Sequence, residues 1–364
     1  MNTVNISNNL PEKKPNFLNL AKGLAIFLML WGHCIQYCIP NNIDFFENVG
    51  FKIIYSFHMP FFMIISGYLF YFSFQKRELK QLLTYKTQGM LHAILGGTIF
   101  IYITYDYILM LRSGSAFAIF NGNALNSINT LWFLWSVFSA SLTVGFIFKK
   151  FNKLWIQLFM LMLGMIFVML FPCGQQNVFM YPYYVLGFLF AKYKDSISPK
   201  VLNLKYLSIP IYIFLMFFFK KKHYIYTSGL FGNGHSIKEA FLIDLYRYVV
   251  GLFGVIAVFV CLEVFYKFVI CKTCSLSFWQ TLERFGSKSL QIYVVSVSLL
   301  SGYLPLLYNL TKNIFPSLDI FLASHILFYN CVFTVCIALA YSAILYFIIK
   351  LFEKIKLSKI IFGR

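Results

Sequence analysis

Long apolar segments alternate with short polar segments along this chain of 364 residues. As helices, the apolar segments are long enough to cross about 30 Å of hydrocarbon, allowing for tilt. The pattern therefore predicts an all-α fold, a polytopic membrane helical bundle of about ten transmembrane helices. The predicted spans cover residues 17–39, 49–74, 89–111, 130–149, 153–171, 178–194, 204–220, 241–270, 287–309 and 321–351.

The composition excludes a soluble globular protein. Hydrophobic residues make up 60% of the chain, charged residues make up 12%, and the mean hydropathy is +0.72. A soluble domain of this size with so few charges would not remain in solution. The chain is therefore divided into a polar N-terminal tail (1–16), one transmembrane domain (17–351) and a basic C-terminal tail (352–364).

The formal net charge of +19 is concentrated in the short segments between the apolar runs. Membrane topology and lipid headgroups explain this distribution, so no nucleic-acid partner is predicted. The basic segments that follow even-numbered spans share one side, and both termini are predicted to be cytoplasmic. The run Lys220–Lys222 falls on the outer side instead. There it contacts headgroups, contacts an anionic substrate, or marks a misplaced span.

Ionisable residues inside the first two spans are the main candidates for chemistry. Lys22 and His33 are eleven residues apart, which places them on one helix face about 16 Å from each other. His58 lies in the second span. Ionisable side chains are costly in hydrocarbon and usually mark a functional site. The alternatives are a lysine that reaches the interface and histidines that bond backbone carbonyls between packed helices.

These residues resemble motifs of the acyltransferase-3 family of integral membrane O-acyltransferases, in particular its fucose-O-acetylase-like and exopolysaccharide-acetylating branch. In the first helix the family has a basic residue, most often arginine, then ten residues and a histidine, which Lys22 and His33 match. Residues 57–67 are similar to its second-helix motif, which ends in Ser-Gly. Residues 132–134 resemble its Trp-Phe-Leu segment, and 183–187 its Tyr-x-x-x-Gly segment.

One position departs from the family pattern. Residues 289–293 are similar to a late motif that often continues to a histidine, and this chain has Ser296 at that place. Family members commonly have about ten spans with both ends in the cytoplasm, in agreement with the hydropathy and charge patterns.

The resemblance implies an O-acyltransferase in a bacterial inner (cytoplasmic) membrane. Such an enzyme would transfer acetyl from cytosolic acetyl-CoA to a sugar hydroxyl of a cell-surface or secreted glycan, or of its lipid-linked precursor. Acetyl-CoA would be the acyl donor, and no permanently bound cofactor is predicted. Membrane lipids and proteins of polysaccharide biosynthesis or export are further implied partners.

Acyl transfer to a hydroxyl needs a proton acceptor, and imidazole suits this role near neutral pH. His33 is the predicted base, while His58 orients the hydroxyl, donates to the oxyanion or relays the proton. Lys22 is predicted to bind a phosphate of the donor, with further contacts from Arg77 and Lys86.

Several residues are predicted to bind substrate or to support the base. Asp106 and Glu47 are candidates for a carboxylate that bonds His33, and Asp244 with Arg247 is interpreted as a structural pair. The outer segment 221–239 fits either a glycan site or a flexible surface loop. Ser66 is read as a nucleophile or, more simply, as part of a close helix contact. The predicted substrate-binding residues are Trp132, Asp106, Glu47, Ser66 and Tyr293.

No metal site is predicted, because the pair Cys271 and Cys274 lacks a second pair of ligands.

Two functional classes other than an enzyme remain open. A glycan-precursor transporter or flippase would use the same polar cavity without forming a bond, although no paired broken helices indicate inverted repeats. The second alternative is a catalytically inactive scaffold of an export complex, which Ser296, in place of the late family histidine, favours slightly. Transfer of labelled acetyl would separate the enzyme from the transporter.

Overall fold

The computed structural model describes residues 16–41, 43–113, 124–230, 234–270 and 277–362. Within these ranges all regular secondary structure is helical, which confirms the all-α prediction. The α-helices are α1 (Phe17–Tyr37), α2 (Val49–Gln75), α3 (Leu79–Ser113), α4 (Ala124–Thr130), α5 (Trp132–Lys150), α6 (Leu154–Met169), α7 (Gly174–Tyr193), α8 (Pro199–Asn203), α9 (Ser208–Met216), α10 (Ile225–Ser228), α11 (Ile237–Phe265), α12 (Ser277–Ser287), α13 (Ser289–Ile314), α14 (Pro316–Ser324), α15 (Ile326–Phe328), α16 (Thr334–Lys354) and α17 (Leu357–Phe362).

Short 3-10 and π segments join or extend some of these helices. The 3-10 segments are η1 (Phe45–Glu47), η3 (Lys194–Ser196), η4 (Leu204–Leu207) and η5 (Lys221–His223), and the π segments are η6 (Tyr266–Ile270) and η7 (Tyr329–Phe333).

Five helical segments of the described residues are long and apolar enough to cross a membrane, and six if the bent pair within α13 forms one span. These five are Phe17–Tyr37, Val49–Gln75, Trp132–Lys150, Ile237–Phe268 and Ile326–Lys354. The other predicted spans coincide with helices that are shorter or more polar. For example, α6 has 16 residues and α9 has 9. The predicted number of about ten spans and the predicted orientation of the termini therefore stay predictions.

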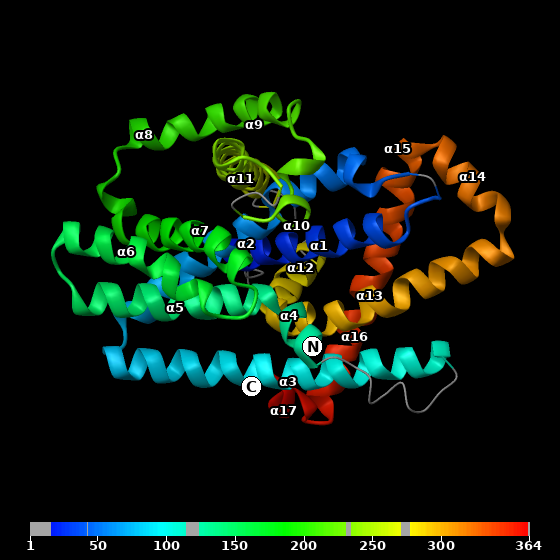
Figure 1. Cartoon of the computed structure of the whole chain (residues 1–364), viewed down its shortest axis with the longest axis horizontal. Helices are drawn as coiled ribbons and strands as arrows, with labels where there is room; N and C mark the ends of the chain where they lie inside the picture. The colour runs from blue at the N-terminus through cyan, green and yellow to red at the C-terminus, as the bar shows by residue number, and fades with distance from the viewer. Residues whose placement is uncertain (1–15, 42, 114–123, 231–233, 271–276, 363–364) are drawn as a thin grey trace, which may run out of the picture.

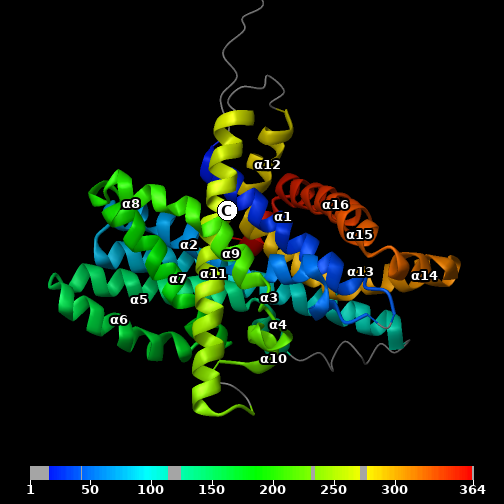
Figure 2. The same cartoon turned by 90° about the horizontal axis from the view of Figure 1, so that it is seen from above.

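Helices α1 and α2 lie in the middle of the molecule, and the remaining helices surround them (Figure 1). Helix α7 packs along α2, while α12, α13 and α16 pack against α1. Helix α11 contacts α2 and α9, and Figure 2 shows it running across the other long helices. The two helices that carry the candidate catalytic residues are therefore enclosed by protein on several sides.

Side-chain caps fix where the two central helices begin. The Asn16 side chain accepts a hydrogen bond from the Asn19 N–H at the start of α1, and Asn48 accepts one from Phe51 at the start of α2. Such caps satisfy backbone N–H groups that have no partner within the helix. His33 lies near the end of α1, and His58 lies in the first half of α2. Because a short connection joins the helices, both histidines lie toward the same end of the bundle.

Reciprocal glycine contacts hold α2 against α7. A Cβ added at Gly67 would clash with the carbonyl oxygen of Tyr184, and one added at Gly187 would clash with that of Ile64. Small residues allow this close approach of two backbones inside a membrane. The contact explains the Ser-Gly sequence of the second span as a packing feature at Gly67.

Replacing Gly67 by leucine should therefore destabilise the protein. Forcing a side chain against a backbone carbonyl costs at least ~1–3 kcal/mol, because the two helices must separate. The measurement is the fraction of detergent-solubilised protein that stays monodisperse after heating. Gly89→Leu is the matched control, since a Cβ at Gly89 meets no atom within 4 Å. Equal thermal stability of the two variants would contradict the proposed helix contact.

Candidate active site

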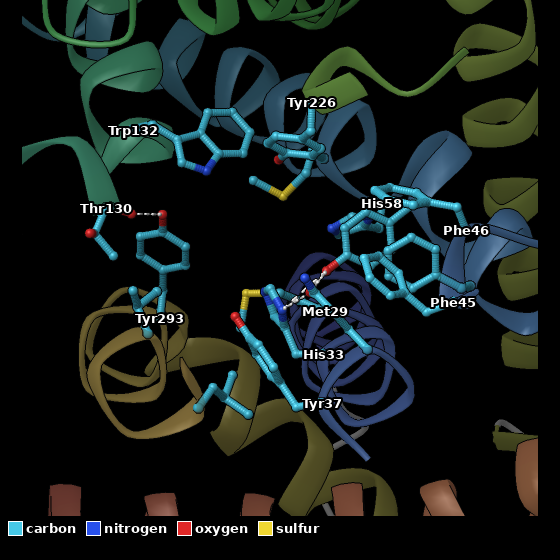
Figure 3. Close-up of a pocket in the computed structure, with 16 residues that line it drawn as sticks. Met29, His33, Tyr37, Phe45, Phe46, His58, Thr130, Trp132, Tyr226 and Tyr293 are labelled. Carbon is cyan, nitrogen blue, oxygen red and sulfur yellow. Dashed lines mark hydrogen bonds between the residues drawn. The ribbon is translucent and has the colours of Figure 1, made fainter. Parts of the chain in front are cut away.

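A cavity of about 250 Å³ lies where α1, α2, α5, α10 and α13 meet. Figure 3 shows His33, His58, Trp132 and Tyr293 around it, so the structure brings together four of the residues predicted for the site. Aromatic and apolar side chains form most of the wall, a composition typical of small-molecule sites. The lining residues are Met29, His33, Gln36, Tyr37, Phe45, Phe46, Phe51, Tyr55, His58, Met59, Thr130, Trp132, Tyr226, Tyr293, Val297 and Leu300.

The ring of His33 is held by two hydrogen-bonding side chains. Its Nδ1 lies 3.1 Å from Gln36 Oε1 and 3.1 Å from the Tyr55 hydroxyl. An amide oxygen only accepts hydrogen bonds, so the contact with Gln36 Oε1 favours the neutral tautomer that carries its proton on Nδ1. Nε2 then carries a lone pair, as a general base requires. Stacking with Tyr37, at a centroid distance of 5.8 Å, fixes the plane of the ring.

Gln36 and Tyr55 were not among the residues predicted from the sequence, which pointed to a carboxylate. Gln36 is three residues after His33 on the same helix, so helical spacing could have identified it. Glu47 instead forms an ion pair with Lys52. The side chain of Asp106, in α3, lies outside the described part of the structure.

His58 bonds a backbone carbonyl, as the packing alternative predicts, and it also borders the cavity. Its Nδ1 lies 2.9 Å from the carbonyl oxygen of Ile54. Because a carbonyl only accepts, Nδ1 donates and Nε2 of the neutral ring is an acceptor. A neutral His58 therefore cannot donate a hydrogen bond to an oxyanion. Tyr55 lies between the histidines, with its ring 5.9 Å from His33 and 4.6 Å from His58 between centroids.

Trp132 offers a donor on the opposite wall. Its indole nitrogen faces the cavity in Figure 3 and has no hydrogen-bond acceptor among the described residues. The neighbouring Tyr293 donates to the carbonyl of Thr130 at 3.4 Å. Ser296, at the position of the late family histidine, is fully buried and donates to the Tyr293 carbonyl, and it does not line the cavity.

A second cavity of about 130 Å³ adjoins the first and is lined by Lys22 and Ser66. The two cavities share Met29, Met59 and Tyr293 as lining residues. Lys22 and His33 thus face neighbouring cavities along one side of α1, as their spacing predicted.

Comparison with known proteins gives a family match that covers the site. The sequence model of the acyltransferase-3 family, described as an acyltransferase domain, matches residues 16–349. The chain belongs to the acyltransferase-3 family. The matched range includes every residue that lines either cavity.

Two curated relatives are similar to part of this acyltransferase-3 chain. Nodulation protein NolL of Mesorhizobium japonicum is 29% identical over 179 residues, which are 48% of this chain and 47% of the relative. Nodulation protein NolL of Sinorhizobium fredii is 31% identical over 190 residues, 48% of each chain. The chain thus spans about half the length of the curated relatives it matches. No solved structure matches it significantly.

The two other predicted donor-binding residues lie away from the cavities of this acyltransferase-3 protein. The Arg77 guanidinium is 3.9 Å from the ring centroid of Tyr85, and the Lys86 ammonium is 5.0 Å from that of Phe70. Neither lines the cavity that contains Lys22. Their predicted contact with the donor therefore needs a ligand that extends beyond this cavity.

Among the described residues, no group of three or more histidine, cysteine, aspartate or glutamate side chains could hold a metal ion. The pair Cys271 and Cys274 lies outside the described residues. Asp244 and Arg247 form the ion pair that the sequence suggested, at 2.5 Å, and Arg247 is buried.

Proposed function

We propose that the protein is a membrane O-acyltransferase that transfers acetyl from cytosolic acetyl-CoA to a sugar hydroxyl. The acceptor would be a glycan of the cell surface or its lipid-linked precursor, and the site of action a bacterial inner membrane. One observation carries this proposal above the others. The imidazole of His33 lines a cavity that adjoins a second cavity lined by Lys22, and the two residues are about 16 Å apart along α1, a separation that an extended pantetheine arm can bridge.

The proton acceptor in this reaction is Nε2 of His33. It removes the proton from the acceptor hydroxyl as the oxygen attacks the thioester carbonyl. The tetrahedral intermediate collapses with cleavage of the carbon–sulfur bond, and the imidazolium returns the proton to the leaving thiolate. Gln36 favours the required tautomer, and Tyr55 helps to hold the ring in place. His58 accepts a hydrogen bond from the acceptor or takes part in proton relay.

Negative charge develops on the carbonyl oxygen during the attack and needs a donor. The indole N–H of Trp132 supplies one from the wall opposite the histidines. The cavity of about 250 Å³ accommodates a short acyl group beside the acceptor hydroxyl, which supports acetyl as the transferred group.

Replacing Lys22 by alanine should raise the KM for acetyl-CoA about tenfold and change kcat less. The ammonium is proposed to contact a phosphate of the donor, and a hydrogen bond to a charged group contributes ~1.5–3 kcal/mol. The measurement is initial rate against acetyl-CoA concentration in membranes. Lys22→Arg is the matched control and should keep the affinity, since the family more often has arginine there. Equal KM values in the alanine variant and the parent would move the donor site elsewhere.

The proposed activity is tested by transfer of radiolabelled acetyl in isolated membranes. Membranes that contain the protein are incubated with labelled acetyl-CoA, and label is followed in the glycan and glycolipid fractions. Membranes with the His33→Ala variant, at equal protein content, are the control. Label in the glycan of the parent membranes alone supports the enzyme. A transporter or an inactive scaffold would leave the label on the donor in both samples.

A further inference from the structure

One buried arginine ties together a whole loop beside the active-site cavity. The side chain of Arg247, in α11, is 2% exposed and forms hydrogen bonds with six groups. Nε bonds the carbonyl of His223 at 3.0 Å. The terminal nitrogens bond three further carbonyls, the Ser228 hydroxyl and the Asp244 carboxylate. Those three carbonyls belong to Lys222, Tyr224 and Gly229, at 3.1, 3.1 and 2.8 Å.

This loop, residues 222–229, also contacts the connection between α1 and α2. The Tyr224 hydroxyl donates to the carbonyl of Phe46 at 3.1 Å. Beside the loop, Lys221 forms an ion pair with Asp44 at 2.6 Å, and this hydrogen bond lowers the pKa of the Asp44 carboxyl. The lysine run therefore lies at the end of the bundle where α1 meets α2, which is the predicted outer end.

Tyr226 is the side chain that the loop presents to the cavity (Figure 3). Its ring lies 6.1 Å from that of Trp132 between centroids, at an interplanar angle of 75°. Tyr226 is 49% exposed, so core packing does not use the whole ring. Tyr226 and His58 also line a small cavity of about 30 Å³ that Arg247 borders. The arginine thus holds the loop directly next to a candidate catalytic histidine.

We propose that Tyr226 and Trp132 bind the ring of the sugar acceptor and that Arg247 is a positioning residue that fixes Tyr226 for this purpose. The inference rests on the proposed function and adds the element that recognises the acceptor. For residues 222–229 it also favours the glycan-site interpretation over a flexible surface loop.

The physical basis is the amphipathic character of a sugar ring. The C–H face of the ring packs against an aromatic face through dispersion and the hydrophobic effect, while the hydroxyls point to polar groups. Two aromatic rings at a steep angle form a corner that holds one pyranose near Nε2 of His33. A buried guanidinium is costly unless all its donors are paired, and here carbonyls of one loop satisfy most of them. Movement of the loop would leave these donors unpaired, so Tyr226 stays in place.

The test compares acceptor kinetics of Tyr226→Ala, Tyr226→Phe and Tyr206→Ala. Tyr206 is the matched control, because it is also 49% exposed but lies in η4, away from the cavities. The probes are methyl glycosides of glucose, galactose, mannose and fucose, with propane-1,2-diol as an acceptor that has hydroxyls but no ring. Tyr226→Ala should raise the KM for the glycosides that the parent uses about tenfold. It should leave the KM for acetyl-CoA within twofold and raise the KM for the glycosides more than the KM for the diol, and Tyr226→Phe should resemble the parent.

Arg247→Lys tests the positioning role. This variant keeps the charge but loses the planar set of donors, so it should raise the glycoside KM while kcat changes less. Correct folding is checked by monodispersity and by an unchanged KM for acetyl-CoA. If the parent transfers acetyl to glycosides and Tyr226→Ala has the parent's glycoside KM, the inference is wrong and the proposed function stands. If the parent transfers no acetyl to any probe or native glycan, both fail.

Discussion

Replacing His33 by alanine should reduce acetyl transfer at least about a hundredfold while the protein still inserts and folds. A positioned general base contributes roughly 10²–10⁴ to a rate, and no other described imidazole combines a fixed tautomer with two side-chain partners in this cavity. The side chain is partly exposed to the cavity, so its removal leaves the surrounding helix contacts in place. The measurement is labelled acetyl in glycan per amount of monodisperse protein.

Two controls make this experiment specific. Imidazole added to the His33→Ala membranes should restore part of the activity, because the enlarged cavity can admit the free base. Gln36→Ala should lower kcat less than His33→Ala does, because it removes the hydrogen bond that favours the Nδ1–H tautomer but keeps the base. Unchanged transfer in His33→Ala would assign the base to another residue, with His58 the next candidate.

The central helices could be predicted closely from the sequence, and the reason is local. Apolar runs bounded by Asn16 and Asn48 mark both starts, and the observed helices Phe17–Tyr37 and Val49–Gln75 nearly coincide with the predicted spans. The region 204–220 behaves differently. There η4 and the nine-residue α9 replace one continuous span, and Pro210, in the first turn of α9, has no N–H to continue α-helical bonding back into η4. Hydropathy alone cannot distinguish a short apolar helix from a spanning one.

The candidate site could be predicted where its members lie on one helix or match a family motif. Lys22 and His33 were found through helical spacing, and Trp132 and Tyr293 through resemblance. Tyr226 was considered only as part of the segment 221–239, and Tyr55 was missed because no local pattern records its contact with His33 on the neighbouring helix. The Arg247 network joins residues that are up to 25 positions apart, and its partners are mostly backbone carbonyls, which any sequence supplies.

Under the proposed function, the lining shared by the two cavities gives a route by which the donor would reach His33. Met29 and Met59 border both cavities, and both are buried, with exposures of 2% and 6%. Methionine has three rotatable bonds and can move aside for a narrow thioester arm. The acetyl group of a donor held near Lys22 would pass between these side chains to reach His33.

Replacing both methionines by phenylalanine should reduce acetyl transfer about ten- to a hundredfold without a comparable loss of acetyl-CoA binding. The rigid phenylalanine rings would fill the junction between the two cavities. Moving them aside for the thioester would overpack the neighbouring side chains at a cost of ~1–3 kcal/mol. The measurements are the transfer rate and binding of labelled acetyl-CoA to purified protein. The double leucine variant is the control, because leucine conserves volume and should retain most of the activity. A phenylalanine variant that is stable, binds the donor and transfers acetyl at the parent rate would show that the thioester reaches the base by another path. In that case the alignment of the ammonium and the imidazole on one face of α1 would have no part in the reaction.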